Sequence, residues 1–400
     1  PEWSNLVQTG YDENPAFSPW QPWTEGLDIN LVESPDLCAY LYREITLLQK
    51  IAALLDQTEP VLSLEALADN LKSAVLNSWN GHRATFQYWD RDNHISSKGE
   101  TLKSRTGPGE ILLDMVFDFP SRLQIVLKAE DLPRPSVEIT IHGTLANGQP
   151  RVETIPSATL NWIDGICRYT LPQLYAEVEH MHIAGLPKEG TAEIKIADHY
   201  QDDQTLLTPI WAEIPSPKQV KSILKRKLKN PNFYGKPYGI PAVPKPPVKD
   251  AEASGMLVWL PWAAMIMEGL ISYNKVAEAS EIFARHMQGI IENLKQESSF
   301  RAYYRADMIA SVGQRNHIIG LPSPGLFLEV LGVRPVTPWK FAIQHKNPFP
   351  WPVTIEYRGS KVTSDAEKVE IEFLDGETIT LTGEFPCVVE NQPTPVEDKK

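Results

Sequence analysis

The segment "ILLDMVFDFPSRLQIVLKA", residues 111–129, decides the fold class, because its apolar residues alternate with polar ones or run together over short lengths. Such spacing is typical of β-strands. The same texture recurs in "SVEITIHGT", "ATLNWI", "EVEHMHIAG" and "TAEIKIA", with turn residues between the segments. Short strands at regular intervals predict a β-sandwich. We therefore predict a sandwich over residues 107–212, in which "ILLDMVFDF" and "RLQIVLKA" are separate strands.

Helical periodicity flanks this segment on both sides. In residues 34–55 leucine and isoleucine recur near the 3.6-residue period, with Ser34 as N-cap and Pro35 at the first helical position. The helices before and after the strands must pack together, because neither group buries its apolar face alone. Alternation returns in residues 351–384 and predicts antiparallel strands. Further helices are predicted at residues 63–80, 216–228, 258–274, 275–297 and 322–332.

This pattern predicts four parts and a tail. Residues 1–106 and 213–337 form two parts of one helical domain, and residues 107–212 are inserted between them as the β-sandwich. Residues 338–390 form a small C-terminal β region, and residues 391–400 form a disordered tail. The predicted fold class is therefore mainly α with β modules.

Charge and composition exclude several function classes. The 38 basic and 51 acidic residues give a net charge of −13 without a basic stripe, which argues against binding to nucleic acid or anionic membranes. No apolar run approaches the roughly 20 residues of a membrane span. The three cysteines and nine histidines lack metal-ligand spacing, so we predict neither a metal nor another cofactor. The chain begins at Pro1 without a leader, and we expect a cytoplasmic protein, processed or truncated at its N-terminus.

The stretch "QTGYDENPAFSPW", residues 8–20, has an unusual composition for a loop. Asp12 and Glu13 lie between Gly10 and Pro15, with aromatic residues close on both sides. Two interpretations are open at this point. Asp12 is either a turn residue that satisfies its own loop, or a carboxylate in an aromatic-lined cleft. In such a cleft sugars stack, and a raised pKa suits proton donation.

Several segments resemble, in order along the chain, glycoside hydrolase family 63 and its mannosylglycerate-hydrolase-like relatives. "TGYDENP" resembles the family's Thr/Ser-Gly-x-Asp-x-Ser-Pro motif, and residues 31–52 resemble the helix that follows it. The resemblance implies an (α/α)6-toroid glycosidase domain with a β-insert, which hydrolyses glycosides with inversion at the anomeric carbon. Other matches are the Trp-rich residues 78–100, the Pro-x-Trp-Ala and Tyr-Gly-Ile-Pro segment 206–244, the Val-Trp-x-Pro helix 258–274, the active-site stretch 303–333 and the β region 347–362.

The resemblance also assigns catalytic roles. Asp12 matches the family's general acid. The base is normally a glutamate in a Phe-x-Glu-x-Tyr context, and Ala302 stands in its place two residues before Tyr304. Alanine cannot accept a proton, so three alternatives are open. Glu297 or Asp307 serves as the base, the chain is an inactive form, or it binds a sugar without cleaving it.

Further residues are assigned to substrate binding, each against a structural alternative. The aromatic residues are candidate sugar platforms, although large aromatics in helical hairpins are more often part of the core. Asp90 is either a ligand of sugar hydroxyls or a solvated residue in a polar loop. Arg315 and His317 are candidates for contacting a charged aglycone such as glycerate. The predicted substrate-binding residues are Tyr11, Phe17, Trp20, Trp23, Trp79, Asp90, Trp259, Tyr304, Arg315 and His317.

The predicted function is inverting hydrolysis of an α-glucoside or α-mannoside, including a glycerate conjugate. The alternative is a catalytically inactive relative that binds carbohydrate or serves as a structural protein. The sequence pattern contains about half of the helices of a full toroid, so we expect an incomplete ring. Open apolar helix faces favour a homo-oligomer or a partner chain that completes the toroid.

Overall fold

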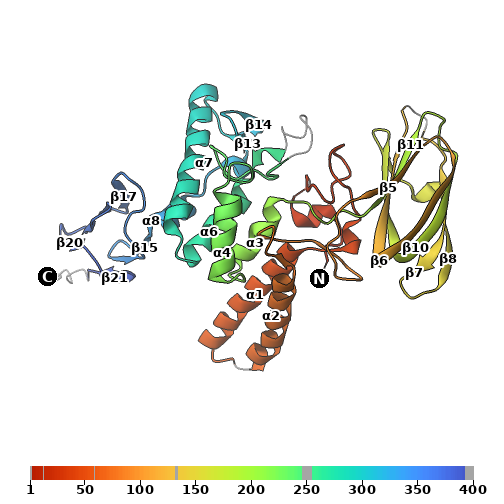
Figure 1. Ribbon diagram of the computed structural model, residues 1–400. Helices are drawn as coiled ribbons and strands as arrows, with labels where there is room; N and C mark the ends of the chain where they lie inside the picture. Colours follow the sequence, from red (N-terminus) through yellow and green to blue (C-terminus); the bar gives the residue numbers. More distant parts are fainter. Residues whose placement is uncertain (1, 12, 58, 131–133, 246–254, 392–400) are drawn as a thin grey trace, which may run out of the picture. The chain divides into compact units, whose positions relative to one another are not determined.

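The computed structural model describes residues 2–11, 13–57, 59–130, 134–245 and 255–391 (Figure 1). It divides into two compact units: unit 1 is Pro1–Lys227 with Ala242–Met256, and unit 2 is Leu228–Pro241 with Leu257–Lys400. Each unit has its own helices, sheets and core. The division into domains made from the sequence stays a prediction, and residues 392–400 of the predicted tail lie outside the described residues.

The helices of unit 1 follow the sequence periodicity. Pro35 occupies the first turn of α1 after Ser34, as predicted, although the Ser34 hydroxyl does not cap the helix and instead donates to Asp36. α1 and α2 pack as a helical hairpin (Figure 1), and α4 continues into a π-helical turn over Leu224–Leu228. The α-helices described in unit 1 are α1 (Pro35–Leu54), α2 (Glu59–Asn77), α3 (Thr208–Trp211) and α4 (Pro217–Ile223).

One large antiparallel sheet dominates unit 1. Its strands are hydrogen-bonded in the order β5-β11-β6-β10-β7-β8, with β9 paired to β10. β6 and β10 are 20 and 19 residues long, and they pair with each other over most of their lengths. The strands are β5 (Thr101–Thr106), β6 (Gly109–Lys128), β7 (Glu138–Leu145), β8 (Pro150–Ile155), β9 (Trp162–Ile163), β10 (Ile166–Ala184) and β11 (Thr191–Ile196).

This sheet corrects the expectation that residues 111–129 form two separate strands, whereas the sandwich itself stays a prediction. The segments 111–119 and 122–129 form one strand, β6, although Pro120 lies between them. Proline has no backbone N–H to donate, and the pairing of β6 with β10 skips from Val116 to Ser121 there. Odd-numbered positions of both segments are buried in the same core, including Ile111 and Ile125. The two segments therefore share one face of a single continuous sheet.

Short strand pairs and a second core complete unit 1. β1 (Val32–Glu33) pairs with β4 (Trp89–Asp90), and β2 (Trp79–Asn80) pairs with β3 (Thr85–Phe86). The second core combines residues that precede the large sheet in the sequence with residues that follow it. Its members are Ala16, Phe17, Leu27, Ile29, Val32, Tyr88, Ala197 and Leu206. Residues that precede and follow the large sheet in the sequence therefore pack into one core of unit 1.

Unit 2 combines a helical hairpin with three small sheets. α6 and α7 are joined at Asn274, whose φ of 57° allows the sharp turn, and the hinge predicted there is confirmed. α8 ends at Gly332, also as predicted. Its elements are α6 (Leu260–Ser272), α7 (Val276–Glu297), α8 (Pro324–Leu331), β12 (Leu257–Val258), β13 (Arg301–Arg305), β14 (Ser311–Arg315), β15 (Val333–Thr337), β16 (Lys340–Ile343), β17 (Val353–Tyr357), β18 (Ser360–Ser364), β19 (Val369–Glu372), β20 (Thr378–Leu381) and β21 (Cys387–Glu390).

The prediction of a mainly α fold with an (α/α)6-type ring is wrong. Across the described residues, strands hold about as many residues as helices and form six sheets. Seven α-helices are described, of which α3 and α4 have 4 and 7 residues and are too short to form toroid hairpins. Helical periodicity located the long helices. It could not report the short strands that the connecting segments form in their tertiary context.

Candidate functional site

The loop around residue 12 is anchored on both sides in unit 1. A short 3-10 helix, Leu6–Thr9, ends at Gly10, whose φ of 69° turns the chain. Tyr11 is completely buried and donates its backbone N–H to Thr9 Oγ1 at 3.0 Å. Asn14 is 2% exposed. Asp12 itself lies outside the described residues, so its role as general acid stays a prediction.

A buried polar network holds the far end of this loop. Asn14 donates from Nδ2 to the Tyr88 hydroxyl at 3.1 Å, and that hydroxyl donates to Asp203 Oδ2 at 2.6 Å. The other Asp203 oxygen accepts from the backbone N–H and the hydroxyl of Thr205, at 2.8 and 2.6 Å. Each of these side chains is at most 2% exposed. The network therefore fixes the residues that follow Asp12 to the interior of unit 1.

Burial makes this network sensitive to protonation. Loss of hydration raises the pKa of Asp203 to about 6, although the hydrogen bonds from Thr205 and Tyr88 act in the opposite direction. Burial also raises the pKa of Tyr88 well above its usual range, and the neighbouring Asp203 raises it further. Sequence reasoning missed both residues. Asp203 is visible in the sequence only as the N-cap of a 3-10 turn, a pattern that carries no information about burial.

The aromatic residues assigned to this loop have different exposures. Phe17 is 4% exposed and packs edge-on against Tyr88, with ring centroids 5.1 Å apart. Trp79 packs in the same manner against Phe86, and Trp23 is half-buried. Trp20 is 59% exposed and is the most accessible of the group. Contact of these residues with a sugar stays a prediction.

Asp90 does not lie in an open polar loop, and that expectation is wrong. Its side chain is 2% exposed and forms an ion pair with Arg122, whose side chain is 1% exposed. Arg122 also donates to the carbonyl oxygens of Leu171 and Pro172, at 3.0 and 2.7 Å. Both charges are therefore paired inside unit 1, where an unpaired charge would be costly. Sequence reasoning missed Arg122, a charged residue that belongs to a core strand.

In unit 2, Ala302, the residue predicted to stand at the position of the base, lies in β13. Ala302 is 5% exposed, and a Cβ built on Gly313 of the neighbouring strand would lie 2.9 Å from the Ala302 Cβ. Tyr304, on the same buried face, accepts from the backbone N–H of Arg301 at 3.1 Å and donates to the Gly320 carbonyl at 3.2 Å. Ala302 is therefore closely packed, and its role and that of Tyr304 toward a substrate stay predictions.

The alternative bases are both carboxylates with cationic partners. Glu297 accepts from the Ser311 hydroxyl at 2.8 Å and from Arg301 Nε at 2.5 Å, and these bonds lower its pKa. Burial acts to raise the pKa of Asp307, but Arg305, which donates to both carboxylate oxygens at 2.9 and 2.8 Å, lowers it overall. Both groups are charged at neutral pH. Glu297 has both oxygens engaged, which suits an acceptor of further hydrogen bonds better than a general base.

An aromatic pair lies on the same face of the hairpin as the Glu297–Arg301 pair. Arg301 and Tyr303 alternate along β13 with the buried Ala302, so their side chains share the less buried face. The Tyr303 ring lies 4.9 Å from that of Trp259, which is 6% exposed and packs edge-on against a second tryptophan. A carboxylate, a guanidinium and a pair of aromatic rings are thus close together in unit 2.

Arg315 and His317 lie at the exposed end of the same hairpin. Arg315 pairs with Arg301 across β13 and β14, which places both guanidinium groups on one side of the strand pair. His317 is exposed, and its Nδ1 accepts from the backbone N–H of Ile319 at 3.3 Å. Their contact with a charged aglycone stays a prediction. Within the described ranges, no group of three or more His, Cys, Asp or Glu side chains is placed to hold a metal, and no helix is both long and apolar enough to cross a membrane.

Comparison with known proteins finds likeness in structure and none in sequence. No family model and no curated protein matches the chain. It is similar to the GH63 mannosylglycerate hydrolase from Thermus thermophilus in complex with glucose, with 13% identity, a TM-score of 0.38 and coverage of 70% of this chain and 44% of that one. It is also similar to the neutral trehalase Nth1 from Saccharomyces cerevisiae, with 9% identity, a TM-score of 0.39 and coverage of 72% and 36%.

A third similar structure is a sialidase, with 10% identity, a TM-score of 0.45 and coverage of 94% of this chain and 29% of that one. The chain spans less than half the length of each of these structures. The family that the motifs resemble is therefore also found among similar structures, together with another glycoside hydrolase. The likeness to each of these structures is partial.

Proposed function

We propose that the chain is a glycoside-hydrolase-like protein that binds an α-glucoside or α-mannoside, with Asp12 as the general acid of an inverting reaction. The observation that carries this proposal is the group on β13 and α7, in which the charged Glu297 and Arg301 lie beside the Tyr303–Trp259 rings. The role of Asp12 rests on its motif alone, and the buried network of Asn14 holds the chain next to it within unit 1.

This combination of side chains suits a sugar. Charged carboxylate and guanidinium groups make strong hydrogen bonds to hydroxyls, and aromatic rings contact the apolar face of a pyranose. Arg315, on the same side of the hairpin as Arg301, adds a second cation that favours an anionic aglycone such as glycerate. A sugar or sugar–glycerate conjugate therefore satisfies the whole group, whereas a purely apolar ligand would leave its charges without partners.

In this proposal, the protein with alanine at position 302 hydrolyses glycosides slowly. An inverting glycosidase needs a carboxylate that removes a proton from water, and Ala302 cannot supply one. Glu297 is already bound by Ser311 and Arg301, and its lowered pKa makes it a weak base. The second candidate function, carbohydrate binding without cleavage, is favoured by the same two observations.

The decisive experiment compares two variants at one position. Ala302→Glu adds a base, and Ala302→Gln adds the same volume without one, so the crowding against Gly313 is common to both. Ala302 lies on the face of β13 opposite Arg301 and Tyr303. If a glutamate side chain at this position reaches the sugar, we expect Ala302→Glu to hydrolyse α-glucosides or α-mannosides faster than Ala302→Gln and the parent chain, with inversion seen by anomer-resolved NMR. Equal rates in the two variants, with sugar binding intact, would favour the binding protein. Full activity of the parent would place the base elsewhere.

Sugar binding is tested separately, because either variant at position 302 could fail to fold. We expect Tyr303→Leu to weaken binding of a glucoside or mannoside panel in calorimetry, since it removes the ring that contacts Trp259. Tyr303→Phe is the matched control and keeps the ring. If the parent chain binds none of the panel, the proposed function fails.

A further inference from the structure

The face of the β13–β14 hairpin that carries the proposed sugar group also carries an exposed valine. Val312 is 40% exposed and lies directly opposite Tyr303. Residues that stand opposite each other in an antiparallel pair project to the same side of the sheet, with Cβ atoms about 4.5–5.5 Å apart. Among the described residues this sheet has the order β12-β13-β14, so Val312 lies on its outer strand. A ligand that rests on the Tyr303 ring is therefore within reach of this valine.

A β-bulge sets the order of side chains along this face. Arg301 pairs with Arg315 and Tyr303 pairs with Val312, so β14 takes three residue steps where β13 takes two. In a regular ladder, Gln314 would stand opposite Arg301 instead. A bulge re-aims the side chains of the longer strand. Here it brings Arg315 beside Arg301, and the face has a cationic end and an apolar end.

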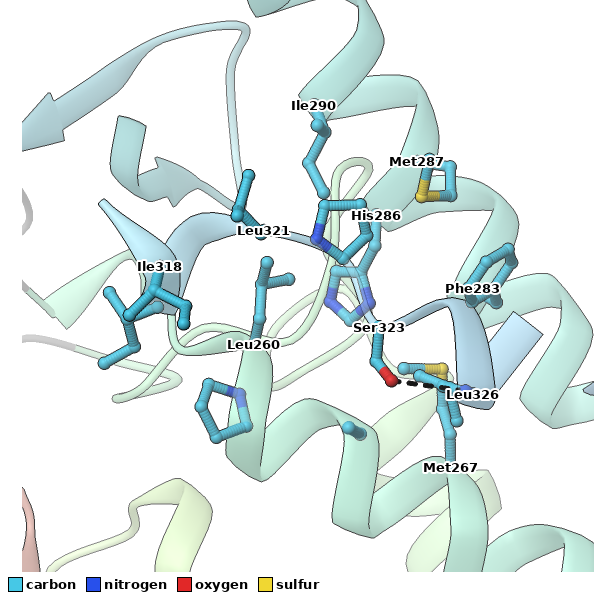
Figure 2. A pocket seen from close by; sticks show the side chains of 14 residues that line it. Leu260, Met267, Phe283, His286, Met287, Ile290, Ile318, Leu321, Ser323 and Leu326 are labelled. Carbon is cyan, nitrogen blue, oxygen red and sulfur yellow. Dashed lines mark hydrogen bonds between the residues drawn. The ribbon is translucent and has the colours of Figure 1, made fainter. Parts of the chain in front are cut away.

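Two apolar side chains that follow β14 belong to a different part of unit 2. Ile318 and Leu321 line an apolar pocket of about 150 Å³ between α6, α7 and α8, and Figure 2 shows both side chains around it. The lining of that pocket shares no residue with the group on β13. Of these three aliphatic side chains, Val312 is therefore the one that lies with the proposed sugar group.

The valine bears on which sugars the group accepts. The Tyr303 ring contacts the apolar face of a pyranose, and the two arginines pair with hydroxyl or acidic groups. A ring substituent that reaches Val312 meets hydrocarbon, where a hydroxyl loses hydration without gaining a hydrogen bond. A methyl group in the same place buries apolar surface instead. The C5 substituent of a hexoside is a hydroxymethyl group in glucose and mannose, and a methyl group in 6-deoxy sugars.

We propose that Val312 makes this site selective for 6-deoxyhexosides, whose C5 methyl group contacts the valine side chain. The pyranose ring lies on Tyr303, and its hydroxyls or an acidic aglycone face Arg301 and Arg315. The inference rests on the proposed function and names its sugar more narrowly, as the 6-deoxy form of an α-glucoside or α-mannoside. Val312 is thus a specificity-determining residue of that site.

Two pairs of methyl glycosides test this selectivity. Methyl 6-deoxy-α-D-mannopyranoside and methyl α-D-mannopyranoside differ only by the oxygen on C6, and the corresponding glucosides differ in the same way. Calorimetry with the full chain measures the affinity for each. In the series that binds, we expect the 6-deoxy glycoside to bind about fourfold more tightly, the factor that burial of one further CH₂ group gives.

A matched pair of variants tests the residue. Val312→Thr replaces one methyl group by a hydroxyl at nearly unchanged shape, and threonine is as compatible with a strand as valine. This variant should bind both members of a pair equally well, because its hydroxyl can pair with the C6 hydroxyl. Val116→Thr makes the same change on β6, where the valine is 74% exposed, and should keep the fourfold preference.

The outcomes separate this inference from the proposed function on which it rests. If the parent chain binds none of the four glycosides, both are overturned. If it binds the two members of each pair with equal affinity, the proposed function stands and the inference is overturned. A 6-deoxy preference that Val312→Thr leaves unchanged also overturns the inference, because the selectivity would then come from another residue.

Discussion

The buried carboxyl of Asp203 makes the stability of unit 1 depend on pH in an unusual direction. Its pKa is about 6 in the folded protein, against 3.8 for an unperturbed aspartate. The folded state therefore holds this proton more tightly than the unfolded chain does. Its contribution to stability is complete below about pH 4 and is lost as the pH rises through about 6.

We expect Asp203→Asn to remove this dependence. The amide oxygen can still accept from Thr205, and the amide nitrogen can donate to the Tyr88 hydroxyl, so the network keeps its shape. A shift of about 2 units corresponds to about 3 kcal/mol. The variant should therefore gain about 2–3 kcal/mol in free energy of unfolding, relative to the parent, between about pH 4 and about pH 8.

Urea unfolding followed by tryptophan fluorescence measures this difference at each pH. Asp69→Asn, at an exposed position of α2, controls for the removal of a carboxyl as such. A difference between Asp203→Asn and the parent that stays constant within about 0.5 kcal/mol across this range would refute the reasoning. It would mean that the folded Asp203 is hydrated or that the network is open.

Three further predictions concern packing and association. Arg122→Ala should destabilise unit 1 by about 3–5 kcal/mol in urea unfolding, because it leaves the buried Asp90 charge unpaired; a loss near zero would show that the pair is hydrated. Gly239→Ala should lower the melting temperature by several degrees, because the added Cβ would lie 2.0 Å from Cδ2 of the His286 ring. Gly383→Ala should leave the melting temperature unchanged, because open space surrounds that position. Self-association is predicted through the apolar face of α1, where Ile51 is 52% exposed, so Ile51→Glu should shift light-scattering mass toward a monomer; an unchanged mass would exclude this face.

The long helices were predictable because their signals are local. Pro35 at the start of α1 and Asn274 between α6 and α7 act through the backbone of one or two residues, and the sequence displays them directly. The apolar alternation of residues 111–129 likewise identified strand structure. These elements depend little on partners that are distant in the chain.

The features that the sequence concealed all depend on distant partners. Pro120 marks a strand end by local rules, yet β6 runs through it because β10 pairs with the strand on both sides. Asp90 and Asp203 lie in polar stretches that predict exposure, and their burial comes from Arg122, Tyr88 and the core around them. The candidate sugar group on β13 was partly visible, through Trp259 and Glu297, but its Arg301 and Tyr303 were not identified because their common face is set by the hairpin.

The Asp90–Arg122 and Glu25–Lys195 ion pairs join the large sheet to the rest of unit 1, and they limit how this sheet can be exchanged in evolution or by engineering. A segment can be removed from a protein only if the residues that remain tolerate the loss of their partners. Deleting residues 107–190 would remove Arg122 and leave the buried carboxylate of Asp90 without its cationic partner. Deleting β11 as well would remove Lys195, whose Nζ lies 2.5 Å from a carboxylate oxygen of Glu25. Recombination here therefore carries a penalty on both sides of the cut. A chimaera that replaces the sheet should survive only when Asp90 and Glu25 are neutralised in the same step.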